Sequence, residues 1–314
     1  MMNQDQIARW MAFLQKAVSP YHSVAAAEEM LEVAGFQRLS QEDIWKLEQG
    51  GRYYVNLYGT SLAAFRVGEQ CGPEDGFRIA GSHTDWPGFR VKPAAETAAA
   101  GCVKLNVEPY GSPIYSSWMD RPLSMAGRIC VKGENLFHPK TMLVNFTDPM
   151  LVIPSLAIHF NREVNKGVPL NPAKDMQPLL GMIQDSLEAD GLIYRLLEKE
   201  TGVPAEWILN FDLYIYNWEA PVLTGPRKEF ISSPRLDNQT SVYAGLMGIT
   251  QEQRRRRGID LAVLYDNEEI GNKTKQGAES QTLLRVMEKI AGGLGFDRAA
   301  FLAMLSRSFL LSCD

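Results

Sequence analysis

Acidic residues gather directly after an apolar run, at residues 266–269. Residues 261–265 are all apolar, which predicts a strand buried on both faces of a sheet that helices cover on either side. Asp266, Glu268 and Glu269 follow at once, and carboxylates this close repel one another unless cations or water offset their charge. Because ligands bind beyond the carboxyl ends of strands in open α/β sheets, we interpret Glu269 as a metal ligand and Glu268 as a general base. A solvated acidic turn is the alternative.

A histidine and an aspartate stand together after a second apolar run, residues 77–81. In a metal site, His83 would bind the ion and Asp85 would hold the imidazole in one tautomer. The alternative is a structural pair, in which the carboxylate only satisfies the histidine.

Two further aspartates stand next to predicted elements. Asp237 precedes a predicted helix in the run S-P-R-L-D-N, where it would either bridge two metals or cap the helix. Asp314 is the last residue of the sequence and follows a predicted strand at 308–313, so it is either a ligand or a frayed end. Histidine and carboxylates at strand-to-loop junctions suit zinc or manganese, and a two-metal site needs a shared carboxylate.

The elements that position these residues fall into two separated pieces of the chain. Periodic apolar residues predict helices at 7–18 and 25–33, with Ser23 as the N-cap of the second helix. Strands are predicted at 53–57, 62–66, 77–81, 259–265 and 308–313, and further helices at 238–251 and 278–290. The middle of the chain is rich in turns and short strands, with one predicted helix over 176–199. We therefore predict an α/β domain made of residues 1–93 and 229–314, with a β-rich domain, residues 94–228, inserted into it.

Composition narrows the class of protein. A chain of 314 residues with 45% hydrophobic and 22% charged residues is typical of a globular protein with two domains. A net charge of −5 argues against a nucleic-acid or anionic-membrane partner. No apolar run approaches a membrane span, and the polar residues 1–9 show no export signal. The cysteines are scattered, which is typical of reduced thiols and favours a cytoplasmic location: Cys71, Cys102, Cys130 and Cys313.

Several blocks of sequence carry a family resemblance. They are G-S-H-T-D-W-P-G-F-R-V-K-P (81–93), W-M-D-R-P-L-S-M-A-G-R (118–128), I-P-S-L-A-I-H-F-N-R (153–162), S-P-R-L-D-N (233–238) and Y-D-N-E-E-I-G-N-K-T-K-Q-G-A (265–278). In this order they resemble the M18 metallo-aminopeptidases, which include aspartyl aminopeptidase and aminopeptidase I. The blocks cover essentially the whole chain.

The resemblance implies a zinc-exopeptidase-like α/β/α catalytic domain with an inserted β-rich dimerisation domain. It implies a metal-dependent aminopeptidase that removes N-terminal residues, often Asp or Glu, from peptides. The cofactor would be two Zn²⁺ ions per subunit, with Mn²⁺ or Co²⁺ as substitutes. The chain would form homo-oligomers built from dimers, as in a tetrahedral dodecamer.

Metal ligands follow from the resemblance position by position. His83 would bind one zinc, Asp237 would bridge both, and Glu269 would bind the second. Asp314 falls where the family's S-x-D motif supplies another ligand to the zinc held by His83.

The remaining site residues are also carried over from the family. Glu268 would be the general base, and Asp85 would orient His83. His159 resembles a histidine that reaches the active site of a neighbouring subunit, and a buried structural histidine is the alternative.

One departure from the family affects the expected activity. The family continues past S-x-D into a segment that carries the last zinc-binding histidine, whereas this sequence ends at Asp314, and its other histidines, His22, His138 and His159, lie elsewhere. We therefore interpret the sequence as truncated. The alternative function is a catalytically inactive subunit that folds, oligomerises and holds at most one metal. A two-metal amidohydrolase acting on acylated amino acids is a third reading.

The preferred N-terminal residue is left open by the sequence. Lys273 and Lys275 follow the acidic motif and could pair with a substrate carboxylate, which would favour N-terminal Asp or Glu. As solvated loop lysines they would have no such role.

Overall fold

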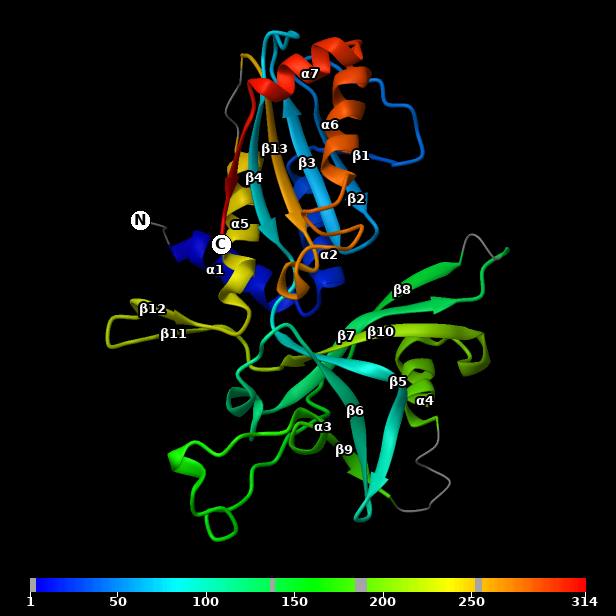
Figure 1. The fold of residues 1–314 in the computed structure, drawn as a ribbon, viewed down its shortest axis with the longest axis vertical. Coiled ribbons are helices and arrows are strands. Elements are labelled where there is room, and N and C mark those ends of the chain that lie inside the picture. The colour runs from blue at the N-terminus through cyan, green and yellow to red at the C-terminus, as the bar shows by residue number, and fades with distance from the viewer. Residues whose placement is uncertain (1–3, 136–138, 184–190, 252–255) are drawn as a thin grey trace. The chain divides into compact units, whose positions relative to one another are not determined.

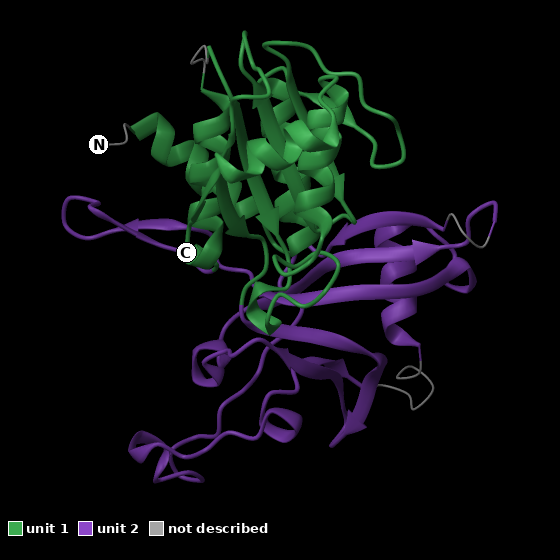
Figure 2. Cartoon of the chain, turned by 45° about the horizontal axis from the view of Figure 1, so that its top comes forward, with its two compact units in different colours: residues 1–86, 235–314 green, residues 87–234 purple. Residues whose placement is uncertain are grey.

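The computed structural model describes residues 4–135, 139–183, 191–251 and 256–314. The chain divides into two compact units (Figure 2). Unit 1 is formed by residues 1–86 and 235–314, and unit 2 by residues 87–234. The sequence prediction placed its boundaries at 93/94 and 228/229. The short strand that the sequence predicts at 136–137, residues 184–190 of the predicted helix over 176–199, and His138 lie outside the described residues.

Unit 1 is built on a six-stranded mixed sheet (Figure 1). Its strand order is β1-β2-β3-β13-β4-β14. The strands are β1 (Gln37–Leu39), β2 (Arg52–Leu57), β3 (Ser61–Val67), β4 (Phe77–His83), β13 (Ile259–Tyr265) and β14 (Phe309–Ser312). β13 pairs parallel with β4, and β14 pairs parallel with the other side of β4. The carboxyl ends of these three strands therefore meet at one edge of the sheet.

Helices cover both faces of this sheet, as the apolar character of β13 predicted. On one face, buried residues of the strands pack against α1 (Gln4–Lys16), α2 (Pro20–Val33) and α5 (Leu236–Thr250). On the other face they pack against α6 (Thr282–Gly293) and α7 (Arg298–Ser306). Leu261 and Val263 face α6 and α7, while Ala262 and Leu264 face the other helices. The α/β fold class with an α/β/α arrangement is confirmed.

The second helix begins earlier than its sequence pattern indicated. Ser19 is the N-cap of α2, and its hydroxyl oxygen accepts a hydrogen bond from the backbone N–H of His22. The prediction of Ser23 as the N-cap is wrong, because Pro20 fits the first helical turn, where its missing N–H costs nothing. Ser23 instead lies buried inside the helix.

Unit 2 is built on a second six-stranded sheet, with strand order β8-β7-β10-β5-β6-β9 and antiparallel neighbours. Its strands are β5 (Gly88–Ala99), β6 (Cys102–Tyr110), β7 (Leu123–Val131), β8 (Lys140–Asn145), β9 (Leu179–Met182) and β10 (Ile208–Asn217). A separate ribbon joins β11 (Val222–Thr224) to β12 (Phe230–Ser232). The helical elements are η1 (Tyr115–Trp118), η2 (Val164–Lys166), α3 (Pro172–Asp175), α4 (Leu192–Thr201) and η4 (Ala205–Trp207).

The helix predicted over residues 176–199 is only partly present. α4 covers its end, but Leu179–Met182 forms the strand β9, which pairs with β6. Pairing with a strand far away in the sequence overrides the local apolar pattern here. Among the described residues, no helix has the length and apolar character needed to cross a membrane.

Candidate metal centre

Strand register brings the predicted ligands to one edge of unit 1. His83 is the last residue of β4, and it lies opposite Tyr265, the last residue of β13. Ser312 at the end of β14 lies opposite Gly81, so Asp314 is two residues further along, at the level of His83. The chain after β13 supplies Glu268 and Glu269. The register thus places His83 and Asp314 at the same end of the sheet as the turn that carries the two glutamates.

The imidazole of His83 is buried and faces several carboxylates. Its Nε2 lies 3.5 Å from Asp237 Oδ1, 3.6 Å from Asp314 Oδ1 and 3.9 Å from Glu268 Oε2. Among the described residues, Nε2 has no hydrogen-bond partner. A buried nitrogen without a partner costs free energy, so its place among negative charges favours a bound cation or a proton.

Asp85 is fully buried behind His83. The distance from His83 Nδ1 is 3.1 Å to the backbone oxygen of Asp85 and 3.3 Å to its Oδ1. The same carboxylate accepts hydrogen bonds from the backbone N–H groups of Glu268 and Glu269 at 3.3 and 3.2 Å. One side chain therefore contacts both the imidazole and the start of the Glu268–Glu269 turn.

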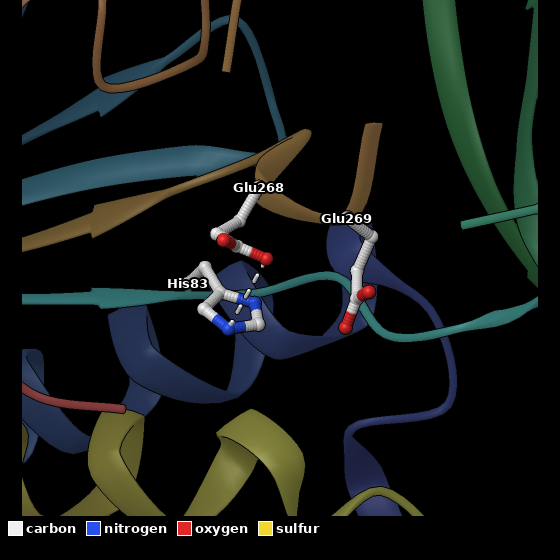
Figure 3. Close-up of side chains that lie close together, drawn as sticks. All are labelled: His83, Glu268 and Glu269. Carbon is white, nitrogen blue, oxygen red and sulfur yellow. Dashed lines mark ion pairs between the residues drawn. The ribbon is translucent and has the colours of Figure 1, made fainter. Parts of the chain in front are cut away.

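The two glutamates belong to η5 (Glu268–Ile270), a single turn of 3₁₀-helix (Figure 3). Asn267, with φ of +63°, and Gly271, with φ of +94°, bound this turn, and both tolerate the left-handed region. The hydroxyl of Thr274 donates to Oδ1 of Asn267 at 2.7 Å. In Figure 3 the Glu268 side chain lies beside the His83 ring, while the Glu269 carboxylate lies on another side of it.

Asp237 and Asp314 are held together through Asn238. Asn238 is buried, and its Nδ2 donates to the backbone oxygen of Cys313 at 2.9 Å and to Asp314 Oδ1 at 3.3 Å. The backbone at Asp237 and Asn238 is not helical, so the regular part of α5 begins after them. The Asp237 side chain is 66% exposed, and that of Asp314 62%. Both can therefore reach a ligand at the edge of the sheet.

The crowded carboxylates shift the proton affinities of the site. Burial alone lowers the pKa of His83, but the hydrogen bond and charge of Asp85 and the charges of Glu268 and Asp237 outweigh it and raise that pKa to about 9. Burial, with the charges of Asp237 and Asp85, raises the pKa of Glu269 to about 7. The site thus has an excess of negative charge that attracts protons when no metal is bound.

This donor set fits a metal ion. Ligand atoms of His83, Glu268 and Glu269 lie within 4.8 Å of one another, and so do those of His83, Asp237 and Asp314. One imidazole nitrogen with carboxylate oxygens is a set that zinc accepts. His83 belongs to both groups, and its Nε2 has no hydrogen-bond partner in the part of the chain that the structure describes, which agrees with this chemistry.

Comparison with known proteins identifies the family. The family described as aminopeptidase I zinc metalloprotease (M18) matches residues 13–314. The chain belongs to the M18 family of metallo-aminopeptidases. Its members are zinc metalloproteases, so the M18 chain is a hydrolase with zinc as the expected metal.

Related proteins resemble the M18 chain along 96–98% of its length. It is 42% identical over 303 residues to a probable M18 family aminopeptidase 2 of Clostridium novyi, covering 96% of this chain and 70% of the relative. A chain in a cryo-EM structure of the Ape4 and Nbr1 complex is 31% identical, with a TM-score of 0.92 over 98% of this chain and 62% of that one. The mApe1 dodecamer of S. cerevisiae is 27% identical, with a TM-score of 0.81 over 98% and 70% of the two chains.

The other predicted residues lie outside this cluster. His159 belongs to unit 2 and is exposed in the single chain, so the fold of this chain alone does not bury it. The ammonium of Lys275 lies 4.3 Å from the centre of the Tyr58 ring, while Lys273 is exposed. Asn238 was not predicted as a site residue, although it stands beside Asp237 in the run S-P-R-L-D-N.

Proposed function

We propose that this M18 chain removes N-terminal residues from peptides through a two-metal centre at the strand ends of unit 1. The observation that carries the proposal is the buried Nε2 of His83, which has no hydrogen-bond partner among the described residues and faces carboxylates from three separate segments of the chain. Several carboxylates around one buried nitrogen repel one another, and bound metal ions would offset this repulsion.

The ligand roles we propose are those that the family resemblance implies. His83 and Asp314 hold one zinc, Glu269 holds the second, and Asp237 bridges both. The close grouping of His83, Asp237 and Asp314 supports the first zinc. The effect of the Asp237 charge on the pKa of Glu269 supports a shared site for these two carboxylates.

Bound zinc would polarise the scissile carbonyl and lower the pKa of water toward neutrality. Glu268 is the general base in this proposal. Its side chain is 39% exposed, so its carboxylate can reach both water and a peptide. It accepts a proton from the attacking water as the new C–O bond forms, and it gives that proton to the leaving amine as the C–N bond breaks. Asp85 contacts Nδ1 of His83 and so holds the imidazole with Nε2 directed to the metal.

We assign catalysis to unit 1 and assembly to unit 2. The related mApe1 of S. cerevisiae forms a dodecamer, which supports a homo-oligomer for this chain. In unit 2, His159 stands between Leu156 and Phe160, which are 66% and 82% exposed. Apolar side chains exposed on both sides of His159 fit a segment that a neighbouring subunit covers, and we propose that His159 reaches that subunit's active site.

The substrate class to test first is a peptide with N-terminal Asp or Glu. The exposed Lys273 stands four residues after Glu269 in the loop beyond the site, where its charge could favour an acidic side chain. Lys275 is a weaker candidate because its ammonium lies over the Tyr58 ring.

The test combines metal content with turnover. The purified chain is loaded with zinc or manganese, its metal content is measured, and the release of N-terminal Asp, Glu and Leu from short peptides is followed with and without a chelator. Glu268→Gln should keep the metal content of the wild type and lose turnover, because the amide cannot accept the proton from water. Glu279→Gln, an exposed glutamate in the same loop, is the matched control and should keep both.

The outcomes separate the rival readings. Two metals with chelator-sensitive release support the proposal, whereas substantial activity in Glu268→Gln would contradict Glu268 as the base. One metal without turnover would support the inactive subunit. Release from N-acyl substrates in place of free-amine peptides would support an amidohydrolase.

A further inference from the structure

A buried glutamine connects two helices to the loop that carries the metal centre. Gln239 is fully buried in the first regular turn of α5, which packs against both α2 and β4 (Figure 1). Its Oε1 accepts a hydrogen bond from the hydroxyl of Ser23 on α2 at 2.9 Å. Its Nε2 donates to the backbone oxygen of Thr84 at 2.8 Å. Both ends of the amide are thus used inside the core of unit 1.

The acceptor of this amide lies between two residues of the proposed site. Thr84 stands between His83 and Asp85, and its carbonyl belongs to the peptide bond that leads into Asp85. The hydroxyl of Thr84 donates to the backbone oxygen of Thr60 at 2.7 Å, and its N–H donates to that of Tyr265 at 2.8 Å. Gln239 supplies the donor for the carbonyl, so it fixes the orientation of the peptide plane before Asp85.

Gln239 is the polar residue among the buried residues in the regular part of α5, which begins after Asn238. The other residues on its buried side, at helical spacing, are Val242, Tyr243, Leu246 and Ile249. A leucine at position 239 would extend the apolar side of the helix without the free-energy cost of burying an amide. A buried polar group that is hydrogen-bonded at both ends holds its partners in one orientation. Here the Gln239 amide holds the turn from His83 to Asp85 in this way.

We infer that Gln239 is a positioning residue for the metal centre, acting through the carbonyl of Thr84 on His83 and Asp85. The inference rests on the proposed metal-dependent function and adds a residue that neither the strand ends nor the carboxylate cluster contains. Without the Gln239 donor, the peptide before Asp85 can rotate, and Asp85 then loses its alignment with His83 and with the turn at Glu268. The consequence is a weaker site for metal, even though Gln239 touches no ligand atom.

The test measures zinc affinity directly, so it does not depend on turnover. Gln239→Met keeps the length of the side chain and removes both hydrogen bonds. We expect a folded protein whose Kd for zinc is raised about tenfold, the lower end of what outer residues of metal sites cost when replaced. Zinc binding is measured by competition with a chromophoric chelator, and folding by circular dichroism and thermal unfolding.

Two control variants separate positioning from plain loss of stability. Gln49 also bonds at both ends of its amide, with the backbone oxygen of Cys71 at 2.9 Å and the backbone N–H of Cys71 at 2.7 Å. It lies near the start of β13, away from the strand ends that carry the site. Gln49→Met should leave the Kd for zinc unchanged within about twofold. Ile249→Val, a smaller side chain on the buried side of the same helix, should lower the thermal midpoint and also leave that Kd unchanged.

The results decide between the two roles. A folded Gln239→Met variant that binds zinc like the wild type would overturn the inference and leave the proposed function intact. A wild-type chain that binds no zinc would overturn both. If Gln239→Met does not fold, Ser23→Ala takes its place, because without the Ser23 hydroxyl the Gln239 amide is held at one end only and can turn away from the Thr84 carbonyl. A Kd raised about threefold is then expected, and an unchanged Kd would contradict the inference.

Discussion

The carboxylate of Asp85 accepts a hydrogen bond from the backbone N–H of Glu269, with 3.2 Å between Oδ2 and N. Oδ1 of the same group accepts from the N–H of Glu268 and lies 3.3 Å from His83 Nδ1. Asp85→Asn replaces one of these acceptors with an amide NH₂, which faces a donor. We expect the Kd for zinc to rise by about 10–100-fold, because the imidazole and the glutamate turn both lose alignment. Zinc titration by competition with a chelator measures this.

A matched control for this variant lies at the other end of β13. Asp260 is a carboxylate paired with Arg66 and Arg78, and it is far along the strand from Tyr265. Asp260→Asn should lower stability and leave zinc affinity unchanged. If both variants weaken zinc binding equally, the effect of Asp85→Asn comes from general destabilisation and not from its place beside His83.

Zinc binding should displace a proton from His83. Its pKa of about 9 means that the imidazole carries a proton at pH 7.5 when no metal is bound. Zinc takes the neutral form, so its binding at pH 7.5 should release about one proton from His83, and affinity should fall about tenfold per unit as pH drops from about 9 to about 7, where protonation of Glu269 begins to add to the fall. Calorimetric titrations in buffers of different ionisation enthalpy count the released protons. Binding without proton release would contradict the assignment of His83 as a ligand.

Stability should depend on pH through His22. Burial lowers its pKa from 6.5 to about 4, so the folded protein holds it neutral while the unfolded chain takes up a proton below pH 6.5. Its contribution is therefore lost as pH falls from about 6.5 to about 4, and between pH 7.5 and 5.0 the free energy of unfolding should drop by about 2 kcal/mol. Denaturant unfolding with chelator present, for wild type and His22→Gln, isolates this part. An equal drop in the variant would show that His22 does not contribute.

The strand ends of unit 1 are predictable from the sequence because their signals are local. The apolar residues of β13 and the polar residues after it mark both the strand and its end, and the predicted bounds, 259–265, agree with the structure. Because β4, β13 and β14 run parallel, the residues at their carboxyl ends lie at the same end of the sheet. His83, Glu268, Glu269 and Asp314 could therefore be grouped before the structure was known.

Hydrogen bonds between distant segments could not be predicted in this way. Ser23 resembled an N-cap because its sequence context is that of a helix start, but it lies inside α2 and bonds with Gln239, 216 residues away. The hydrogen bonds of Asn238 to the end of β14 likewise depend on tertiary packing. The prediction of a helix around Leu179 was wrong for the same reason, because this segment forms a strand only by pairing with β6.

The loop after the two glutamates should tolerate no side chain at Gly277. A Cβ there would lie 2.1 Å from the backbone oxygen of Asn272, so the backbone must move, and with it the loop that follows η5. We expect Gly277→Ala to lower the free energy of unfolding by about 1–3 kcal/mol and to weaken zinc binding. Gly248→Ala is the matched control, because a Cβ at this exposed helical position has open space, and it should stabilise the chain by about 0.5–1 kcal/mol with zinc affinity unchanged. Denaturant unfolding and zinc titration of the two variants measure both effects. If Gly277→Ala binds zinc as tightly as Gly248→Ala, the packing of this loop against itself does not hold the glutamates in place.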